Sequence, residues 1–160
     1  MRNIIFKTQV KVLTWDELND EQRQLLTIAK EQTKYSYCPY SKFHVGAAVL
    51  LKNGEIVRGC NQENAAYPSG LCAERSALFS AGATYPEQPV LRLAIACYTA
   101  GHFTQEPQAP CGACRQVMLE TEHRYKQKME VLLYGEKEVY VFESAADLLP
   151  LVFVSENLEG

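Results

Sequence analysis

The sequence has no long apolar run, no block of positive charge and no glycine-rich phosphate motif. Lys7 and Lys11 interrupt the apolar residues near the N-terminus, so that run is too short for a signal peptide or a membrane span. The nine glycines form neither a G-x-G-x-x-G nor a G-x-x-x-x-G-K pattern, which leaves dinucleotide and P-loop chemistry without support. We therefore expect a cytoplasmic protein that makes no contact with a membrane.

The charge pattern argues against nucleic acid as a ligand. The formal net charge is -3, and lysine and arginine are spread along the chain instead of forming a basic patch. Tyr35, Tyr37 and Tyr40 are close enough in sequence to suggest a platform for stacking single-stranded bases, but no basic groove accompanies them. We expect a small-molecule partner and no nucleic acid.

Length and cysteine content narrow the class further. A chain of 160 residues fits one domain over residues 1–160, and a hydrophobic fraction of 47% is ordinary for a globular protein. In a reducing compartment, six cysteines are more often metal ligands or buried thiols than members of disulfides. Their spacing must decide between these two uses.

The apolar patterning predicts alternating strands and helices. Residues 3–13 are expected to form an extended N-terminal strand, and a capping box of Thr14 and Glu17 is expected to open a helix that ends near Tyr35. Asn53-Gly54 predicts a tight hairpin turn with positive φ angles. The other predicted elements are strands 43–51, 55–60, 90–98, 129–134 and 138–142, helices 72–81 and 111–123, and a short last helix capped by Ser144 and closed by Pro150. This order favours an α/β fold, a three-layer α/β/α sandwich around a mixed five-stranded sheet.

Three cysteines have the spacing of a metal site. Cys111 and Cys114 form a C-x-x-C pair at the start of a predicted helix, and Cys72 lies at the start of another. Two sulfurs on one helical turn and a third from a second helix can fill three of the four tetrahedral positions of Zn²⁺. Three protein ligands and an open position for water are typical of a catalytic zinc site, with one ion per chain.

Glu74 and Arg75, which follow Cys72 closely in the sequence, suggest how such a site works. Three thiolates give the cluster an excess of negative charge, which positive helix N-termini and hydrogen bonds from Arg75 can offset. Glu74 lies two positions from a ligand, where it can face the bound water without coordinating the metal. We interpret Glu74 as the residue that transfers protons, an arrangement known from zinc deaminases that act on nucleobases.

A purely structural zinc site is the main alternative. One of Cys38, Cys60, Cys97 or His102 would then supply a fourth ligand, and Glu74 would have no role. Without a metal role, Cys38, Cys60 and Cys97 are interpreted as buried thiols. The histidines at positions 44, 102 and 123 occupy no ligand position in the motif.

Five blocks of sequence resemble the small, homotetrameric cytidine deaminases over residues 37–153. The matching segments are PYSKFHVGAA (39–48), GCNQENAAY (59–67), CAER (72–75), PCGACRQ (110–116) and LLP (148–150). The resemblance implies a cytidine deaminase-like fold and a zinc-dependent hydrolysis of cytidine and deoxycytidine to uridine, deoxyuridine and ammonia. It also implies a homotetramer with shared active sites.

The resemblance also implies roles for individual residues. Phe43 would stack on the pyrimidine, while Asn61 and Glu63 would bind the hydroxyls of the ribose. Ala73 would contact the substrate beside them. Ala65, Tyr67 and Phe153 would help to line the site of a neighbouring subunit.

Two segments depart from the family's pattern. Residues 1–13 have no counterpart, which leaves their role open, and Pro68-Ser69-Gly70-Leu71 differs from the loop that usually precedes the first ligand. Enzymes that deaminate blasticidin S look similar around the zinc motifs and are a second candidate. Arg75 and the pair Asn61 and Glu63 favour cytidine, but they do not rank it against deoxycytidine, because both nucleosides offer a 3′-hydroxyl.

Overall fold

A computed structural model describes residues 1–158 of the chain. The helices and strands in chain order are β1 (Lys11–Leu13), α1 (Asp20–Gln32), β2 (His44–Leu51), β3 (Ile56–Cys60), α2 (Ala73–Thr84), β4 (Val90–Thr99), β5 (His102–Phe103), α3 (Gly112–Tyr125), β6 (Glu130–Tyr134) and β7 (Val139–Phe142). Five short 3₁₀ helices accompany them: η1 (Trp15–Glu17), η2 (Thr33–Tyr35), η3 (Tyr67–Ser69), η4 (Ala145–Leu148) and η5 (Ser155–Asn157). Within residues 1–158, no helix has the length and apolar character needed to span a bilayer.

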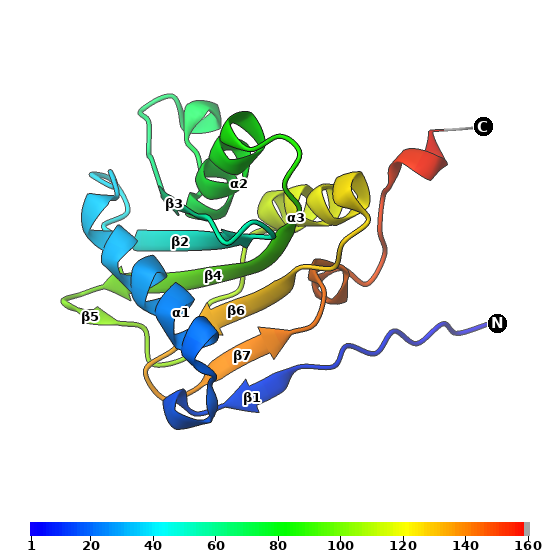
Figure 1. Ribbon diagram of the computed structural model, residues 1–160, viewed down its shortest axis with the longest axis horizontal. Coiled ribbons are helices and arrows are strands. Elements are labelled where there is room, and N and C mark those ends of the chain that lie inside the picture. The colour runs from blue at the N-terminus through cyan, green and yellow to red at the C-terminus, as the bar shows by residue number, and fades with distance from the viewer. Residues whose placement is uncertain (159–160) are drawn as a thin grey trace.

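The strands form one mixed sheet between two helical layers. The strand order is β1-β7-β6-β4-β2-β3, with β5 paired to β4, and β4–β6 is a parallel pair. Figure 1 shows α1 on one face of the sheet and α2 and α3 on the other. The three-layer α/β/α prediction is confirmed, although the sheet has seven strands instead of the five expected, because β1 and β5 join it.

The core lies on both faces of the sheet. Ala47, Val49 and Leu51 belong to the buried cluster that includes residues of α2 and α3, whereas Ala48 and Leu50 belong to the cluster that includes residues of α1. Successive side chains of a strand point to opposite faces. β2 is therefore buried from both sides, which explains why its sequence is apolar throughout and does not alternate.

The first helix begins later than the capping box suggests. Thr14 and Glu17 do form a capping box, but it caps η1, and Leu18 then adopts an extended backbone. The α-helix begins at Asp20, where the Asn19 side chain accepts a hydrogen bond from the Gln22 amide. The prediction of one helix opening at Thr14 was wrong because Asn19 supplies a second and competing cap.

The N-terminal strand and the hairpins also differ in detail from the expectation. Only Lys11–Leu13 pairs with β7. The register places residues 3–9 beyond the end of β7 at Phe142, and Val10 is not part of β1. The β2–β3 hairpin is confirmed, but of Asn53 and Gly54 only the glycine has a positive φ, at 88°. The loop after β4 contains β5, which sequence patterning missed because it is two residues long.

The topology brings the first turns of α2 and α3 to the same end of the sheet. β3 and β4 are both antiparallel to β2, so they run in one direction, and β6 is parallel to β4. α2 follows β3 and α3 follows β4, so both helices begin beyond the carboxyl ends of these strands. This edge is where ligands bind in open α/β sheets.

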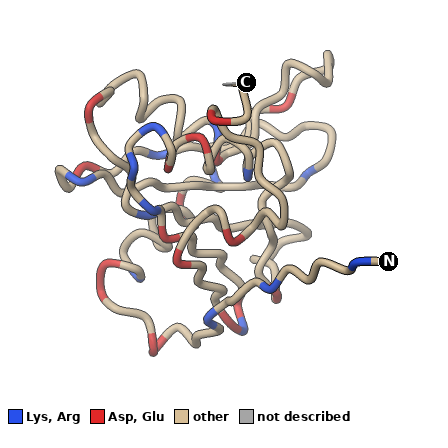
Figure 2. Tube along the Cα trace, turned by 90° about the vertical axis from the view of Figure 1, so that its right-hand side faces the viewer, with Lys and Arg blue, Asp and Glu red and all other residues tan. Residues whose placement is uncertain are grey.

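Gly59 allows α2 to pack directly on β3. A Cβ atom at this position would lie 2.5 Å from the Ala77 amide nitrogen and 2.6 Å from the Ala73 carbonyl oxygen. Any side chain would push the first turns of α2 away from the sheet. Figure 2 shows that acidic and basic residues are interspersed along the chain.

Candidate active site

Three sulfurs meet where α2 and α3 begin. Cys72 is the N-cap of α2, Cys111 is the N-cap of α3, and Cys114 lies in the first turn of α3. Their Sγ atoms all lie within 4.8 Å of one another, and Cys72 Sγ is 3.8 Å from Cys111 Sγ. Cys114 is fully buried, Cys72 is partly buried and Cys111 is exposed, so the group can hold a metal ion and is open on one side.

The cysteines and the histidine considered as a fourth ligand are not part of the three-sulfur group. Within residues 1–158, none of Cys38, Cys60, Cys97 and His102 joins the three-sulfur group. Cys38 Sγ contacts His44 Nδ1 at 3.2 Å, and Cys60 accepts a hydrogen bond from the side-chain amide of Gln62. The structure therefore does not support the alternative of a four-ligand structural site.

The surroundings of the sulfurs favour negative charge. Arg75 Nη2 donates a hydrogen bond to Cys72 Sγ at 3.6 Å. The Cys114 thiol also donates to Cys72, and together with Arg75 this lowers the pKa of Cys72 to about 5, while sharing the proton raises the pKa of Cys114. The N-termini of α2 and α3 add partial positive charge at the same place. These contacts stabilise the negative charge that a thiolate ligand carries.

Glu74 is a buried carboxyl group beside the sulfurs. Its exposed fraction is 4%, and burial raises its pKa above the ordinary value for glutamate. It does not belong to the three-sulfur group. Ala73, its neighbour in the first turn of α2, is completely buried.

Glu74 faces a cavity of about 350 Å³ that reaches the metal group. The walls come from β2, β4, α2, the loop before β2 and the segments that lead from β3 to α2 and into α3. The lining residues are Ser41, Phe43, Val45, Asn61, Glu63, Cys72, Glu74, Ile95, Cys97, Gln108, Ala109 and Cys111. The structure thus brings Phe43, Asn61 and Glu63 together with Glu74, although they lie far apart in sequence. The volume is in the range of small-molecule sites.

Asn61 and Glu63 are held in place by hydrogen bonds to the preceding loop. The Asn61 side chain accepts from the Val45 amide at 2.8 Å and donates to the Phe43 carbonyl at 2.9 Å. The Glu63 carboxylate accepts from the amides of Tyr40 and Ser41 and from the Ser41 hydroxyl, and that last bond lowers the pKa of Glu63. Both side chains retain further hydrogen-bonding capacity for a ligand.

Ala73 is buried beside Glu74 and does not line this cavity, and three other expected substrate-binding residues lie outside it. Tyr67 in η3 is 81% exposed and lines an adjoining hollow of about 570 Å³ with Tyr40 and Arg75. Ala65 is exposed in the loop before η3. Phe153 is 57% exposed in the C-terminal segment, where its carbonyl accepts a hydrogen bond from Gln116. One chain alone does not bring these residues to Glu74.

Several residues of the cavity wall were not predicted from the sequence. Gln108 and Ala109 directly precede the Pro-Cys-x-x-Cys motif, a position that could have indicated them. Cys97 lies at the end of β4 in the cavity, and burial raises its pKa to about 12. Ser41 stands within a family block but was assigned no role.

Comparison with known proteins agrees with this geometry. Residues 19–127 match the family model of the cytidine and deoxycytidylate deaminase zinc-binding region. The cytidine deaminase of Halalkalibacterium halodurans is 39% identical over 142 residues, which cover 88% of this chain and 92% of that protein. The cytidine deaminase of Sporosarcina psychrophila is 40% identical over 135 residues, which cover 84% and 93% of the two chains.

Solved structures give the same result. The cytidine deaminase of Burkholderia pseudomallei is 43% identical and superposes with a TM-score of 0.69, covering 85% of this chain and all of that one. The enzyme from Mycobacterium tuberculosis is 30% identical and has a TM-score of 0.66 over 85% of this chain and 99% of that one. The chain therefore belongs to the family of cytidine and deoxycytidylate deaminases with a zinc-binding region.

Proposed function

We propose that this protein deaminates cytidine and deoxycytidine by hydrolysis, yielding uridine or deoxyuridine and ammonia. The observation that carries the proposal is the position of Glu74, a buried carboxyl group that faces one cavity with the three-sulfur group but does not belong to it. The names of the relatives support the choice of cytidine.

The donor set fits zinc. Cys72, Cys111 and Cys114 offer three soft sulfur ligands and leave one side open, and three protein ligands with an open position are typical of catalytic zinc. When bound, Zn²⁺ supplies Lewis acidity that lowers the pKa of water from 15.7 to roughly 7. Arg75 and the helix N-termini offset the negative charge of the thiolates.

Glu74 moves the protons of the reaction. As water adds through its oxygen to C4 of the pyrimidine, the Glu74 carboxylate accepts a proton from that water and delivers it to N3. Glu74 then takes the proton of the new hydroxyl group and delivers it to the exocyclic amine. The C4–N bond breaks, ammonia leaves and the C4 carbonyl of uridine forms. A carboxyl group whose pKa is raised by burial is suited both to accept and to donate a proton near neutral pH.

Residues that line the cavity, together with Ala73 next to Glu74, would bind the nucleoside. Phe43 would stack on the pyrimidine, Ala73 would lie beside it, and Asn61 and Glu63 would bind the ribose hydroxyls. Hydrogen bonds fix Glu63 and keep its pKa low, so it remains an anion that accepts from hydroxyl groups and repels phosphate. A nucleoside is thus a better substrate than a nucleotide.

Replacing the proton carrier tests the mechanism. We expect Glu74→Gln to lower kcat by at least about 10⁴-fold, because one residue handles several proton transfers. Zinc content is expected to stay near one per chain, since Glu74 is not a ligand. The matched control is Glu87→Gln, which removes an exposed carboxylate from a loop and should leave kcat unchanged. Normal turnover by Glu74→Gln would contradict the assignment.

Replacing a buried sulfur tests the metal site. We expect Cys114→Ser to reduce zinc from about one ion per chain to a small fraction of that, measured by elemental analysis of purified protein, because a hydroxyl is a much poorer zinc ligand than a thiolate. Cys60→Ser should retain zinc, since Cys60 lies outside the group. Full zinc occupancy in Cys114→Ser would show that the ion is bound elsewhere.

A substrate panel tests the reaction class. Loss of the cytosine absorbance would be followed for cytidine, deoxycytidine, cytosine, CMP and blasticidin S with the same wild-type protein. We expect turnover of both nucleosides, and at least about tenfold lower kcat/KM for cytosine, which lacks the sugar, and for CMP, whose phosphate the Glu63 anion repels. Turnover of CMP equal to that of cytidine would contradict the proposed site, and a preference for blasticidin S would favour the second candidate.

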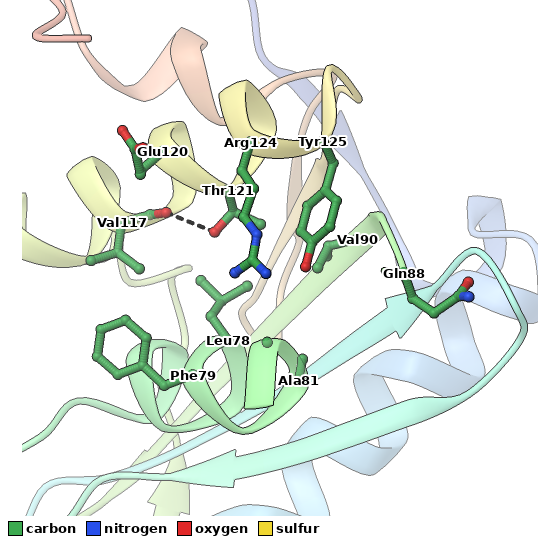
Figure 3. A pocket seen from close by; sticks show the side chains of 11 residues that line it. Leu78, Phe79, Ala81, Gln88, Val90, Val117, Glu120, Thr121, Arg124 and Tyr125 are labelled. Carbon is green, nitrogen blue, oxygen red and sulfur yellow. Dashed lines mark hydrogen bonds between the residues drawn. The ribbon is translucent and has the colours of Figure 1, made fainter. Parts of the chain in front are cut away.

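The proposal includes a homotetramer with shared active sites. Ala65, Tyr67 and Phe153 are exposed in the single chain, so they can reach a cavity if it belongs to a neighbouring subunit. A further hollow of about 280 Å³ lies between α2 and α3. Figure 3 shows Leu78 and Val117 among its walls. Phe79 of α2, at the same hollow, is 51% exposed, and an exposed apolar surface of this kind supports a subunit contact.

Molar mass in solution tests the assembly. Light scattering coupled to size exclusion should give four times the 18.0 kDa of one chain. We expect Phe153→Ala to lower kcat/KM for cytidine about tenfold or more while each chain keeps its zinc, because an apolar wall of the neighbouring site is lost. A monomeric wild-type protein with full activity would contradict shared sites.

The proposed location is the cytoplasm. All six cysteines are free thiols, including three that do not belong to the metal group. Free thiols of this kind persist in a reducing compartment.

A further inference from the structure

The loop before β2 folds over the segment that carries Asn61 and Glu63. The Tyr37 amide donates to the Asn61 carbonyl at 2.9 Å, and the Glu63 amide donates to the Tyr37 carbonyl at 2.7 Å. At the far end of the loop, Lys42 has a φ of 57°, in the left-handed region that non-glycine residues rarely adopt, and its amide donates to the Cys38 carbonyl. The chain therefore turns back on itself at residues 38–43.

Ser41 connects the two substrate-facing residues of this arrangement. Its hydroxyl donates to Glu63 Oε1 and accepts from the Phe43 amide at 3.0 Å. Its own amide donates to Glu63 Oε2 at 3.2 Å, beside the amide of Tyr40 at 2.9 Å. One side chain thus bonds to the carboxylate on one side and to the backbone of the aromatic residue on the other.

These bonds fix the direction in which Glu63 can accept from a ligand. Two amides occupy Oε2, whereas Oε1 accepts from Ser41 alone. A carboxylate oxygen has two lone pairs, so Oε1 keeps one for a hydroxyl group in the cavity. Without the Ser41 hydroxyl, the two amides would still hold Oε2, but Oε1 would lose its bond and could move out of its position as the carboxylate turns about the Cγ–Cδ bond. The Phe43 amide would also lose its acceptor.

We infer that Ser41 is a positioning residue that fixes the sugar-binding carboxylate of Glu63 and the ring-stacking residue Phe43 relative to each other. The inference rests on the proposed function, because it takes Glu63 as the acceptor for a ribose hydroxyl. Ser41 thus sets the distance between the carboxylate that accepts the sugar hydroxyl and the aromatic ring that stacks on the base. Discrimination in favour of sugars with a 3′-hydroxyl should therefore depend on a residue that does not take part in the chemistry.

The test compares Ser41→Ala with cytidine and with 2′,3′-dideoxycytidine, which lacks the hydroxyls that Glu63 would bind. Hydrogen bonds to charged groups are strong enough that we expect kcat/KM for cytidine to fall about tenfold or more, chiefly through a higher KM. For dideoxycytidine we expect a loss of less than about threefold, because the misplaced carboxylate has no hydroxyl to bind. Ser41→Thr keeps the hydroxyl and should recover most of the cytidine activity.

Ser36→Ala is the matched control. Ser36 lies in the same region of the chain, and its hydroxyl bonds to His44 Nδ1 at 2.7 Å and to the Thr33 carbonyl, away from Glu63. This variant removes an anchor near the loop, so we expect any loss of activity to be equal for the two nucleosides. Ser41 is exposed, and the thermal midpoint of Ser41→Ala should stay close to that of the wild type.

The outcomes separate this inference from the proposed function. If wild-type protein deaminates cytidine but Ser41→Ala loses the same factor on both nucleosides, Ser41 stabilises the loop only and the inference is overturned. An unchanged KM for cytidine in Ser41→Ala overturns it as well. Wild-type protein that does not deaminate cytidine at all would overturn the proposed function and this inference together.

Discussion

The convergence of two helix N-termini at one edge of the sheet is the constraint on which the site depends. β3 and β4 run in one direction, and the helix that follows each of them begins on a cysteine, Cys72 or Cys111. The sulfurs meet because β3 and β4 end at the same edge of the sheet and are separated by one strand, β2. Gly59 keeps α2 against β3, so the distance between the two N-termini is a property of the backbone. A metal ligand set built in this way is held by the core and does not depend on flexible loops.

Two carboxylates face the same cavity in opposite electrostatic environments. Burial raises the pKa of Glu74, whereas hydrogen bonds led by that of the Ser41 hydroxyl lower the pKa of Glu63. A group that can exchange a proton is suited to chemistry, and a group that stays ionised is suited to recognition. The opposite directions of the two pKa shifts come from the neighbours of each residue, since the two side chains are chemically identical.

The sequence predicted the features that depend on local patterns. Apolar runs located β2, β4 and β6, and the C-x-x-C spacing located a sulfur group at a helix start. Patterning did not reveal β5, which has two residues and pairs only because Ala100 and Gly101 adopt positive φ angles. The bonds of Ser41 were equally hidden, because they join residues 22 positions apart and need the folded loop. The family resemblance pointed to Glu63 and Phe43, but the bonds that join both residues to Ser41 are seen only in the fold.

The short strand β1 gives the N-terminal extension a structural use. It pairs with Val139–Val141 at the outer edge of the sheet, where apolar residues of β7 would otherwise present free backbone amides and carbonyls. An open edge of this composition is a template on which another chain can add a strand, and such growth leads to aggregation. β1 is then the edge strand itself, but it has three residues where β7 has four, and one of the three is Lys11. Short edge strands and lysine side chains hinder the addition of a further strand, so the extension leaves this side of the sheet a poorer template for another chain than β7 would be.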